Sequence, residues 1–252
     1  MSTPIALITG GSRGLGRSTA LRLAEQGVDI VLTYRRRADE AAAVVAQIEQ
    51  LGRRAVALPL DTGVTAGFGD FAAALRGVLA QTWQREQFDY LVNNAGIGAT
   101  ASVADTTEAQ FDELMNIHVK GVFFLTQTLL PLIADGGRIV NFSTGLTRFT
   151  LPGFAAYAAM KGAVEVFTRY LAKELGPRGI AANVIAPGAI ATDFGGGAVR
   201  DNAQMNHHIA AQTALGRVGL PDDIGGAVAA LLSPGSRWVN AQRIEVSGGQ
   251  SI

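Results

Sequence analysis

The stretch that decides the fold is IALITGGSRGLG, residues 5–16. Its first part, Ile5–Thr9, is a short apolar run of the kind that forms a buried strand. Gly10, Gly14 and Gly16 follow, and a segment with helical spacing continues from them. Glycines at a strand-to-helix turn let the backbone approach an anion, which the helix N-terminus then binds through its free N–H groups. This stretch therefore predicts a parallel α/β sheet with a phosphate-binding loop.

Similar apolar runs recur along the chain between alanine-rich segments with helical spacing. Together with Ile5–Thr9 they make seven predicted strands, the other six being Asp29–Tyr34, Arg54–Asp61, Phe88–Gly96, Gly137–Thr144, Ile180–Gly188 and Gln242–Gly249. Strands that are apolar on both faces and alternate with helices belong in a parallel sheet covered on both sides. We therefore predict a Rossmann-like, doubly wound α/β fold, and a single domain over residues 1–252 because no proline-rich or serine-rich linker divides the chain.

Two segments near the carboxyl end have a distinct character. Residues Ala189–Leu215 show no clear element and contain FGGG at Phe194–Gly197, which predicts a mobile loop or lid. Residues Pro221–Leu232 begin with Pro and Asp and have an amphipathic pattern, which predicts a capped helix that serves as scaffold.

The composition excludes several classes of function. Twenty-one basic and 21 acidic residues give a formal charge of zero, so nothing favours binding to nucleic acid or to an anionic membrane. The chain has no cysteine, which excludes disulfides and cysteine nucleophiles. No run of about 18 apolar residues occurs, and the first residues lack the pattern of a leader. We expect a cytoplasmic protein that binds a small molecule.

The end of the second predicted strand indicates which dinucleotide the chain binds. An acidic residue at this place normally holds the ribose 2′-hydroxyl of NAD, whereas arginine accommodates a 2′-phosphate. Here the strand ends with Tyr34, Arg35 and Arg36, and Arg13 in the phosphate loop is a further guanidinium within reach of the same group. We predict NADP(H), with NAD(H) as the less favoured cofactor. Arg37 is better explained as a solvated residue at the start of the next helix.

Tyr157 and Lys161 give the most specific chemical signal. They stand four positions apart in AAYAAMKGAVEVFTRYLAKEL, a segment with helical spacing, and so share one face of a helix. A phenol has a pKa near 10, so acid–base work near neutrality requires about 4 kcal/mol of preferential stabilisation of the phenolate. A nearby ammonium in a partly dry cleft, together with the positive charge of a nicotinamide, has the required sign and scale.

With these motifs together, the chain resembles a classical short-chain dehydrogenase/reductase, similar to 3-oxoacyl-ACP reductases and glucose dehydrogenases. The resemblance runs from about Ile5 to Gly249 and rests on motifs in the order of that family: TGGSRGLG, Asp61, NNAG at Asn93–Gly96, Asn116 in MNIHVKG, YAAMK, and Pro187-Gly188. It implies that Asp61 and Thr62 border the adenine, that Asn93–Gly96 shape the cofactor cleft, and that Thr192 bonds the carboxamide of the nicotinamide. The residues predicted to contact the cofactor are Gly10, Ser12, Arg13, Gly14, Leu15, Gly16, Tyr34, Arg35, Arg36, Asp61, Thr62, Asn93, Ala95, Gly96, Tyr157, Lys161, Pro187, Gly188, Ile190 and Thr192.

The resemblance also implies catalytic roles. Tyr157 is expected to donate or accept the proton, Lys161 to hold the nicotinamide ribose and lower the pKa of the tyrosine, and Asn116 to hold a water behind the lysine. The family has a serine thirteen residues before the tyrosine, where this chain has Thr144. Ser143 is one position early, and neighbouring residues of a strand point to opposite faces, so only one of the two hydroxyls should serve. Spacing favours Thr144, with Ser143 as the alternative.

These observations predict reversible reduction of a carbonyl group to an alcohol. Two alternatives stay open: a sugar or secondary-alcohol dehydrogenase that works oxidatively, and an NADPH-binding sensor without turnover. Substrate contacts are expected from residues 146–154 and from the segment after Pro187. The three histidines, His118, His207 and His208, lack the spacing of a metal site, so we expect no metal. The resemblance further implies a homotetramer.

Overall fold

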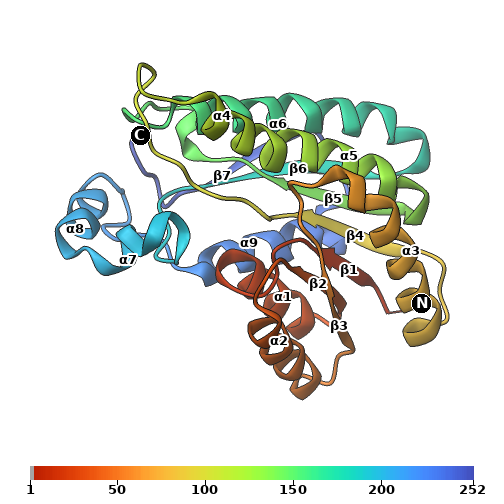
Figure 1. Ribbon diagram of the computed structural model, residues 1–252. Coiled ribbons are helices and arrows are strands. Elements are labelled where there is room, and N and C mark those ends of the chain that lie inside the picture. Colours follow the sequence, from red (N-terminus) through yellow and green to blue (C-terminus); the bar gives the residue numbers. More distant parts are fainter. Residues whose placement is uncertain (1–2) are drawn as a thin grey trace.

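The computed structural model describes residues 3–252 and has a parallel sheet between two layers of helices (Figure 1). The strands are β1 (Ile5–Ile8), β2 (Asp29–Tyr34), β3 (Ala55–Pro59), β4 (Phe88–Asn93), β5 (Ile133–Phe142), β6 (Ala181–Pro187) and β7 (Arg243–Val246). Their order in the sheet is β3-β2-β1-β4-β5-β6-β7, and every pair is parallel. The prediction of a seven-stranded doubly wound fold is confirmed.

Helices connect the strands and cover the sheet. The α-helices are α1 (Gly14–Glu25), α2 (Ala38–Gln50), α3 (Phe68–Val78), α4 (Glu108–Met115), α5 (Gly121–Leu129), α6 (Ala155–Glu174), α7 (Ala198–Asp201), α8 (Ala203–Ala211) and α9 (Pro221–Leu232). Two π-helical turns, η2 (Leu79–Trp83) and η3 (Asn116–Lys120), continue α3 and join α4 to α5. The predicted helix Pro221–Leu232 is observed as α9 with the same bounds.

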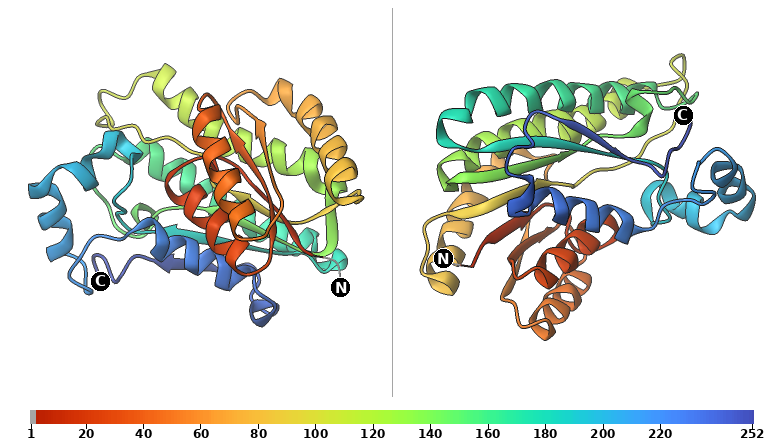
Figure 2. Two further views of the ribbon diagram at one scale, coloured as in Figure 1. Left: turned by 90° about the horizontal axis from the view of Figure 1, so that it is seen from below. Right: turned by 180° about the vertical axis from the view of Figure 1, so that it is seen from behind.

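The alternation of side chains along β1 divides the core into two halves. Ile5 and Leu7 pack with α3, α5 and α6, whereas Ala6 and Ile8 pack with α1, α2 and α9. Figure 2 shows these two helical layers on opposite sides of the sheet. All four residues are fully buried, which is why the sequence of this strand is apolar throughout instead of alternating.

The chain reverses its direction of winding at β1, which lies between β2 and β4. In an open parallel sheet, the ligand crevice lies at such a point, beyond the carboxyl ends of the strands. Several observed strands end before the predicted runs do, for example β1 at Ile8 and β4 at Asn93. The remaining residues of those runs have left the ladder and form loops at the carboxyl edge, where the predicted site lies.

The segment from Ala189 to Leu215 differs from its prediction because it contains regular structure. It forms a 3-10 turn η7 (Phe194–Gly197), then α7 and α8, which project beyond the carboxyl edge of the sheet (Figure 1). The side chain of Asn202 caps α8 by accepting the N–H of Met205 at 2.9 Å. The sequence pattern did not reveal α8 because none of its residues is fully buried, so it has no apolar stripe. Its role as a lid stays a prediction.

None of the helices in residues 3–252 has both the length and the apolar character needed to cross a membrane.

Candidate active site

The loop between β1 and α1 has the geometry of an anion site. Gly10 and Gly14 adopt φ values of +64° and +54°, which side chains other than glycine rarely tolerate. Arg13 is the N-cap residue of α1, and among the described residues no side chain caps this helix. The N–H groups of its first turn are therefore available to a phosphate at the positive end of the helix dipole.

Gly16 is required where the phosphate loop meets the loop after β4. A Cβ at residue 16 would lie 2.2 Å from the carbonyl oxygen of Gly10 and 2.5 Å from Nδ2 of Asn94. That Nδ2 donates to the carbonyl oxygens of Thr9 and Gly10 at 2.9 and 3.1 Å, and the Thr9 hydroxyl accepts the N–H of Ala95 at 3.0 Å. Thr9 and Asn94 thus hold the two loops together. Sequence reasoning did not select either residue, although Asn94 is part of the NNAG motif.

Asn93 lies behind this loop and not in it. Its Nδ2 donates to Thr126 Oγ1 at 3.0 Å and to Asn141 Oδ1 at 2.8 Å, and the side chain is buried between β4, β5 and α5. The side chain of Asn93 thus supports the sheet while Asn94 joins the two loops, and the role of Asn93–Gly96 in shaping the cleft stays a prediction.

The arginines predicted to select the cofactor are exposed at the end of β2. Nε of Arg35 lies 3.8 Å from Oδ2 of Asp61, across the β2–β3 edge, so residues predicted to border the adenosine come together. Arg36 is exposed, and Tyr34 is half-buried against the core. Arg37 instead pairs with Glu40 at 2.8 Å, at the start of α2, as expected. The exposed guanidinium of Arg35 has N–H groups that can bind a phosphate group on the ribose.

Arg13 projects from the phosphate loop toward the segment after β6. Its Nη1 lies 3.9 Å from Oδ2 of Asp193, with the arginine side chain 60% exposed. Thr192 is buried beside Gly14, where a Cβ would lie 3.9 Å from the threonine side chain. The predicted phosphate and nicotinamide regions are therefore adjacent across the crevice.

The turn after β6 is tied to the end of the chain. Oε1 of Gln250 accepts the N–H of Ala189 at 2.8 Å, and a Cβ on Gly188 would lie 2.8 Å from the same oxygen. Pro187 is buried, and Ile190 forms a bridge with Gly219. The residues predicted to border the nicotinamide, Pro187, Gly188, Ile190 and Thr192, therefore lie in one continuous stretch at the carboxyl edge.

Tyr157 and Lys161 share the face of α6 that packs against the end of β5. Tyr157 is 8% exposed and Lys161 is 5% exposed. The Lys161 ammonium donates to the carbonyl oxygen of Phe142 at 2.9 Å and lies 5.7 Å from the centroid of the Tyr157 ring. The predicted pair therefore occupies one buried place at the carboxyl edge of the sheet.

Burial dominates the electrostatics of this pair. It lowers the pKa of Lys161 to about 7. It also raises the pKa of Tyr157 above the usual value for a phenol, and the nearby Thr144 hydroxyl only partly opposes this change. The expectation that Lys161 lowers the pKa of the tyrosine is therefore not met by the chain alone, because removing both groups from water disfavours their charged forms.

The two candidate hydroxyls lie in different surroundings. The hydroxyl of Ser143 donates to Oε1 of Glu165 at 2.6 Å, and Ser143 is buried. Oγ1 of Thr144 accepts the N–H of Leu146 at 3.3 Å, and this hydroxyl lies close enough to Tyr157 to affect its pKa. The structure therefore brings Thr144 to the tyrosine and directs Ser143 away from it.

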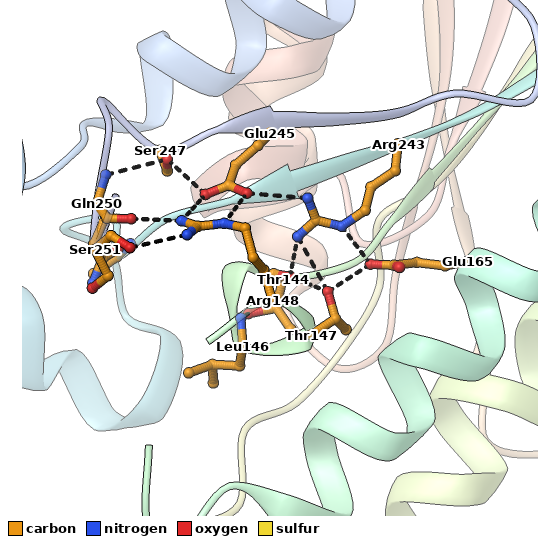
Figure 3. Close-up of polar contacts among 11 residues, drawn as sticks. Thr144, Leu146, Thr147, Arg148, Glu165, Arg243, Glu245, Ser247, Gln250 and Ser251 are labelled. Carbon is orange, nitrogen blue, oxygen red and sulfur yellow. Dashed lines mark hydrogen bonds and ion pairs between the residues drawn. The ribbon is translucent and has the colours of Figure 1, made fainter. Parts of the chain in front are cut away.

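A network of ion pairs surrounds the turn that follows Thr144 (Figure 3). Arg243 on β7 donates to the carbonyl oxygen of Thr144 at 3.0 Å, to Oε1 of Glu165 at 2.7 Å and to Oε2 of Glu245 at 3.1 Å. Arg148 bridges the same Glu245 to the carboxyl end of the chain, with its Nη2 2.6 Å from Oε1 of Glu245. These contacts fix the position of Thr144 through its backbone.

The two arginines also determine the charge of Glu245. The hydrogen bonds from Arg148, opposed by burial and assisted by Arg243, lower the pKa of Glu245 to about 2. Arg148 further donates to the carbonyl oxygens of Gln250 and Ser251 at 2.6 and 2.9 Å (Figure 3). Because Gln250 also holds Ala189, the network connects the turn after β5 with the turn after β6. Sequence reasoning identified none of these residues, since charged residues far apart in a sequence carry no sign of their pairing.

The π-helical turn η3 places His118, not Asn116, against the catalytic tyrosine candidate. The rings of His118 and Tyr157 are 5.3 Å apart between centroids and meet edge to face at 85°. His118 is 1% exposed. Asn116 is half-buried, and its backbone carbonyl accepts the N–H of Gly121. Sequence reasoning missed this arrangement because it evaluated the histidines only as metal ligands or general bases.

Phe194 covers the other side of Tyr157. Its ring lies 6.0 Å from the tyrosine ring, and a Cβ on Gly98 would lie 2.9 Å from Cε1 of Phe194. Gly98 therefore permits the close approach of η7 to the loop after β4. A hollow of about 360 Å³ is lined by Ser102, Val103, Leu146, Thr150, Leu151, Pro152, Gly153, Phe154, Ala155 and Ala158.

Within residues 3–252, no three His, Asp or Glu side chains form a group that could hold a metal ion.

Comparison with known proteins places this site in a family. A family model described as enoyl-(acyl carrier protein) reductase matches residues 10–251. The hydroxynaphthalene reductase-like protein Arp2 of Metarhizium brunneum is 36% identical, over 97% of this chain and 94% of that protein. The structure of the reductase LugOII, which catalyses keto-reduction at C1 during lugdunomycin biosynthesis, is similar with a TM-score of 0.94 and 36% identity, over 100% of this chain and 99% of that one.

A second similar structure contains a cofactor. The angucycline C-6 ketoreductase LanV with bound NADP has a TM-score of 0.93 and 34% identity, over 98% of this chain and 95% of that chain. The match to the family model, the similarity to the curated relatives and the similarity of fold agree. The chain belongs to the short-chain dehydrogenase/reductase family of oxidoreductases.

Proposed function

We propose that the chain reduces a ketone to a secondary alcohol, reversibly, with NADPH as the cofactor. The observation that carries this proposal is the buried group of Tyr157, Lys161 and the Thr144 hydroxyl at the carboxyl edge of the sheet. The reductase and ketoreductase activities named for its relatives support the direction of the reaction.

In this mechanism the substrate carbonyl oxygen is bound by the hydroxyls of Thr144 and Tyr157. NADPH, when held by the phosphate loop and the turn after β6, would supply the hydride that reduces the carbonyl carbon. The Tyr157 O–H donates its proton to the oxygen as negative charge develops there, and a protonated phenol is the form that burial favours. Thr144 stabilises the same oxygen as a second donor, because its O–H hydrogen stays available while its oxygen accepts the Leu146 N–H.

Lys161 acts on the tyrosine without contacting the substrate. Its ammonium is anchored by the Phe142 carbonyl, which leaves its other N–H groups free for a ribose hydroxyl and for a water. When the tyrosine gives up its proton, the nearby ammonium stabilises the phenolate. Burial lowers the pKa of Lys161 to about 7, and the negative charge of the phenolate favours the ammonium form of the side chain.

The cofactor preference rests on Arg35, Arg36 and Arg13. Two of these guanidiniums border the crevice where the ends of β2 and the phosphate loop meet, and no acidic residue occupies the end of β2. Arginine binds a phosphate through paired hydrogen bonds, whereas it offers nothing specific to a 2′-hydroxyl. The NADP bound to LanV supports the same choice.

For the substrate, we propose a fused-ring aromatic ketone. A hollow formed by the turn after Thr144, the start of α6 and the loop after β4 is lined largely by apolar side chains, including Leu146, Leu151 and Phe154. Phe194 adds an aromatic face above Tyr157. Flat apolar molecules bury the most surface in such a space. The naphthalene and angucycline compounds in the names of the relatives are of this shape.

We also propose a homotetramer. Phe123, Phe124 and Tyr170, on α5 and α6, expose 40%, 42% and 64% of their surface. Apolar patches of this kind are commonly covered in assemblies. Light scattering that gave the mass of a monomer at micromolar concentration would contradict this proposal.

The activity is tested by NADPH oxidation with a panel of tetralones, naphthoquinones, aliphatic ketones, β-ketoesters and sugars. We expect turnover with fused-ring ketones, and we expect Tyr157→Phe to lose about 10²- to 10⁴-fold in kcat, since it removes the acid. Full activity of Tyr157→Phe would refute the mechanism. Tight NADPH binding without turnover of any compound would instead indicate a sensor.

The assignment of the substrate-binding hydroxyl to Thr144 and not to Ser143 is tested by comparing one variant of each residue. Thr144→Val should lower kcat by about 100-fold, because one donor to the developing oxyanion is lost. Ser143→Ala should lose much less, since its hydroxyl bonds Glu165. A larger loss in Ser143→Ala than in Thr144→Val would reverse the assignment.

A further inference from the structure

The segment after β7 turns back and pairs with the residues that follow α8. The carbonyl oxygens of Gly248 and Gly249 accept the N–H groups of Leu215 and Ala214 at 3.0 and 3.2 Å. The two glycines have φ values of +64° and +77°, which let the chain bend sharply here. Gln250 follows this bend and is only 7% exposed. A glutamine so deeply buried needs partners for its amide.

The side chain of Gln250 holds the turn after β6. Its Oε1 accepts the N–H of Ala189 at 2.8 Å. The N–H of the preceding residue, Gly188, donates to the carbonyl oxygen of Val246 at 3.1 Å, and a Cβ on Gly188 would lie 2.8 Å from Oε1 of Gln250. The turn is therefore fixed by β7 on one side and by the Gln250 amide on the other, in contact too close for any side chain at residue 188.

The same turn spans the distance from the phosphate loop to Tyr157. A Cβ on Gly14 would lie 3.9 Å from Cβ of Thr192. The Thr192 hydroxyl accepts the N–H of Phe194 at 3.2 Å, and the ring of Phe194 lies 6.0 Å from the ring of Tyr157. A dinucleotide whose phosphates bind at the start of α1 and whose nicotinamide reaches a carbonyl at Tyr157 has to pass along this turn. Residues 188–194 thus flank the reactive half of the cofactor, whereas the proposed adenosine half lies at the end of β2.

The backbone of Gln250 is connected to Thr144 through charged side chains. Nη2 of Arg148 donates to the carbonyl oxygen of Gln250 and to Oε1 of Glu245, both at 2.6 Å (Figure 3). Arg243 donates to Oε2 of Glu245 at 3.1 Å and to the carbonyl oxygen of Thr144 at 3.0 Å. Hydrogen bonds from a guanidinium are stronger than those between neutral groups. The residue that holds the turn after β6 is therefore anchored to the turn that carries the Thr144 hydroxyl.

We propose that Gln250 is a positioning residue that sets the place of the nicotinamide relative to Thr144. This inference rests on the proposed function. The side-chain oxygen of Gln250 holds Ala189 and its backbone is held by Arg148, so one residue joins the turn beside the hydride donor to the turn beside the hydride acceptor. A displacement of about 1 Å between reacting groups can lower a rate by about 100-fold. Gln250 acts through the backbone of Ala189 and takes no part in the transfer of the hydride or the proton.

Three variants separate the hydrogen bond from the size of the side chain. Gln250→Met keeps the length of the side chain and removes the acceptor. Gln250→Glu keeps an acceptor oxygen at the same distance from the backbone. Gln212→Met is the matched control, because Gln212 is an exposed residue of the neighbouring segment whose side chain lies 3.2 Å from Nε2 of His208.

The experiment measures two affinities by isothermal titration calorimetry. One ligand is NADPH, and the other is adenosine 2′,5′-bisphosphate, which has phosphates on the adenosine and no nicotinamide. In Gln250→Met we expect the Kd for NADPH to rise by about 5-fold or more, with the Kd for the bisphosphate unchanged, because only the turn beside the nicotinamide has lost a hydrogen bond. We also expect kcat for ketone reduction to fall by about 10-fold or more. Gln250→Glu and Gln212→Met should both keep the wild-type values.

A Gln250→Met variant that binds NADPH as tightly as the wild type would overturn the proposal. An equal weakening of both ligands would do the same, since it indicates a general loosening of the fold, and so would a loss in Gln250→Glu as large as that in Gln250→Met. A failure of the proposed function is recognised separately, as a wild-type protein that reduces no ketone, and the two affinities then still decide the role of Gln250. If Gln250→Met does not fold, Gln250→Asn, whose amide is one methylene shorter, is compared with Gln250→Glu by the same measurements.

Discussion

At the scale of single residues, the site depends on which way a side chain leaves the end of a strand. Ser143 and Thr144 are neighbours with similar chemistry, yet one bonds Glu165 and the other lies beside Tyr157. Similarly, Asn93 faces the interior of the sheet while Asn94 holds the phosphate loop. Successive residues of an extended chain point to opposite sides, so a one-residue difference in sequence decides between scaffold and site.

Arg35 is expected to distinguish NADPH from NADH. In Arg35→Ala, KM for NADPH should rise about 10-fold or more, because a hydrogen bond between charged groups is worth about 1.5–3 kcal/mol. KM for NADH should not rise, since NADH has no 2′-phosphate. Steady-state kinetics with both cofactors measures this, and Arg37→Ala, whose arginine pairs with Glu40, is the matched control. Equal effects of Arg35→Ala on both cofactors would contradict the assignment.

His118 should also affect stability in acid. Because its pKa is about 3 in the folded protein and near 6.5 in the unfolded chain, the unfolded chain binds the proton first as the pH falls. The contribution of neutral His118 is therefore complete above about pH 6.5 and is lost progressively toward pH 3. Urea unfolding at several pH values should show a weaker loss of stability in His118→Phe over this range, whereas the exposed His207→Phe should follow the wild type.

At the scale of elements, the two hydroxyl groups that we propose as catalytic are held by different parts of the fold. Tyr157 is placed by α6, which has a regular helical pattern and could be predicted from the sequence. Thr144 is placed at the start of a short turn, and Arg243 of β7 donates a hydrogen bond to the backbone carbonyl of Thr144. The sequence predicted every strand of the sheet, because apolar runs report burial directly. It did not predict the ion network or α8, because neither depends on a local apolar period.

The ion network should support both the fold and the reaction rate. Arg243→Met removes the main cationic partner of Glu165. Because the two side chains are only 24% and 15% exposed, we expect the free energy of unfolding to fall by about 3 kcal/mol. Thermal unfolding should show a lower Tm, and kcat should fall because the Thr144 carbonyl has lost a donor. Arg169→Met, at an exposed position of α6, is the control.

The second half of this test removes both charges. In the double variant Glu165→Gln with Arg243→Met, no buried carboxylate remains unpaired, so part of the lost stability should return. If kcat stays low while Tm recovers, the network positions Thr144 in addition to stabilising the fold. A single variant with unchanged kcat and Tm would show that the network does neither.

At the scale of the whole molecule, the crevice lies where the two halves of the sheet meet at β1 and β4. The two helical layers cover opposite faces of the whole sheet, and the site draws its loops from both halves of the strand order (Figure 2). The position of the crevice could be predicted from the order of strands and helices alone. The walls of the crevice could not, because Phe194, Gly98 and Gln250 meet there from segments far apart in the sequence.

Cofactor binding across this crevice should stabilise the whole chain. A ligand that binds only the folded state adds about 2.7 kcal/mol to the free energy of unfolding at 100 times its Kd. At equal millimolar concentrations, NADPH should therefore raise Tm more than NADH does, because its Kd is expected to be lower. Differential scanning fluorimetry measures both shifts. An equal or larger shift with NADH would contradict the proposed cofactor.

The buried amide pair Asn93 and Asn141 has a consequence for how the molecule assembles. The two residues are partners in the β4–β5 register, and their side chains bond each other at 2.8 Å, while Asn141 also donates to Thr168 of α6 at 2.8 Å. Apolar neighbours such as Val92 and Val140 pack almost as well after a shift along the strand, but a displaced amide would be buried without a partner. The paired amides therefore favour the observed register of β4 and β5 over a shifted one. Because Asn94 follows one strand and Thr144 closely follows the other, the register of β4 and β5 sets the position of the phosphate loop relative to Thr144 in the chain without a ligand.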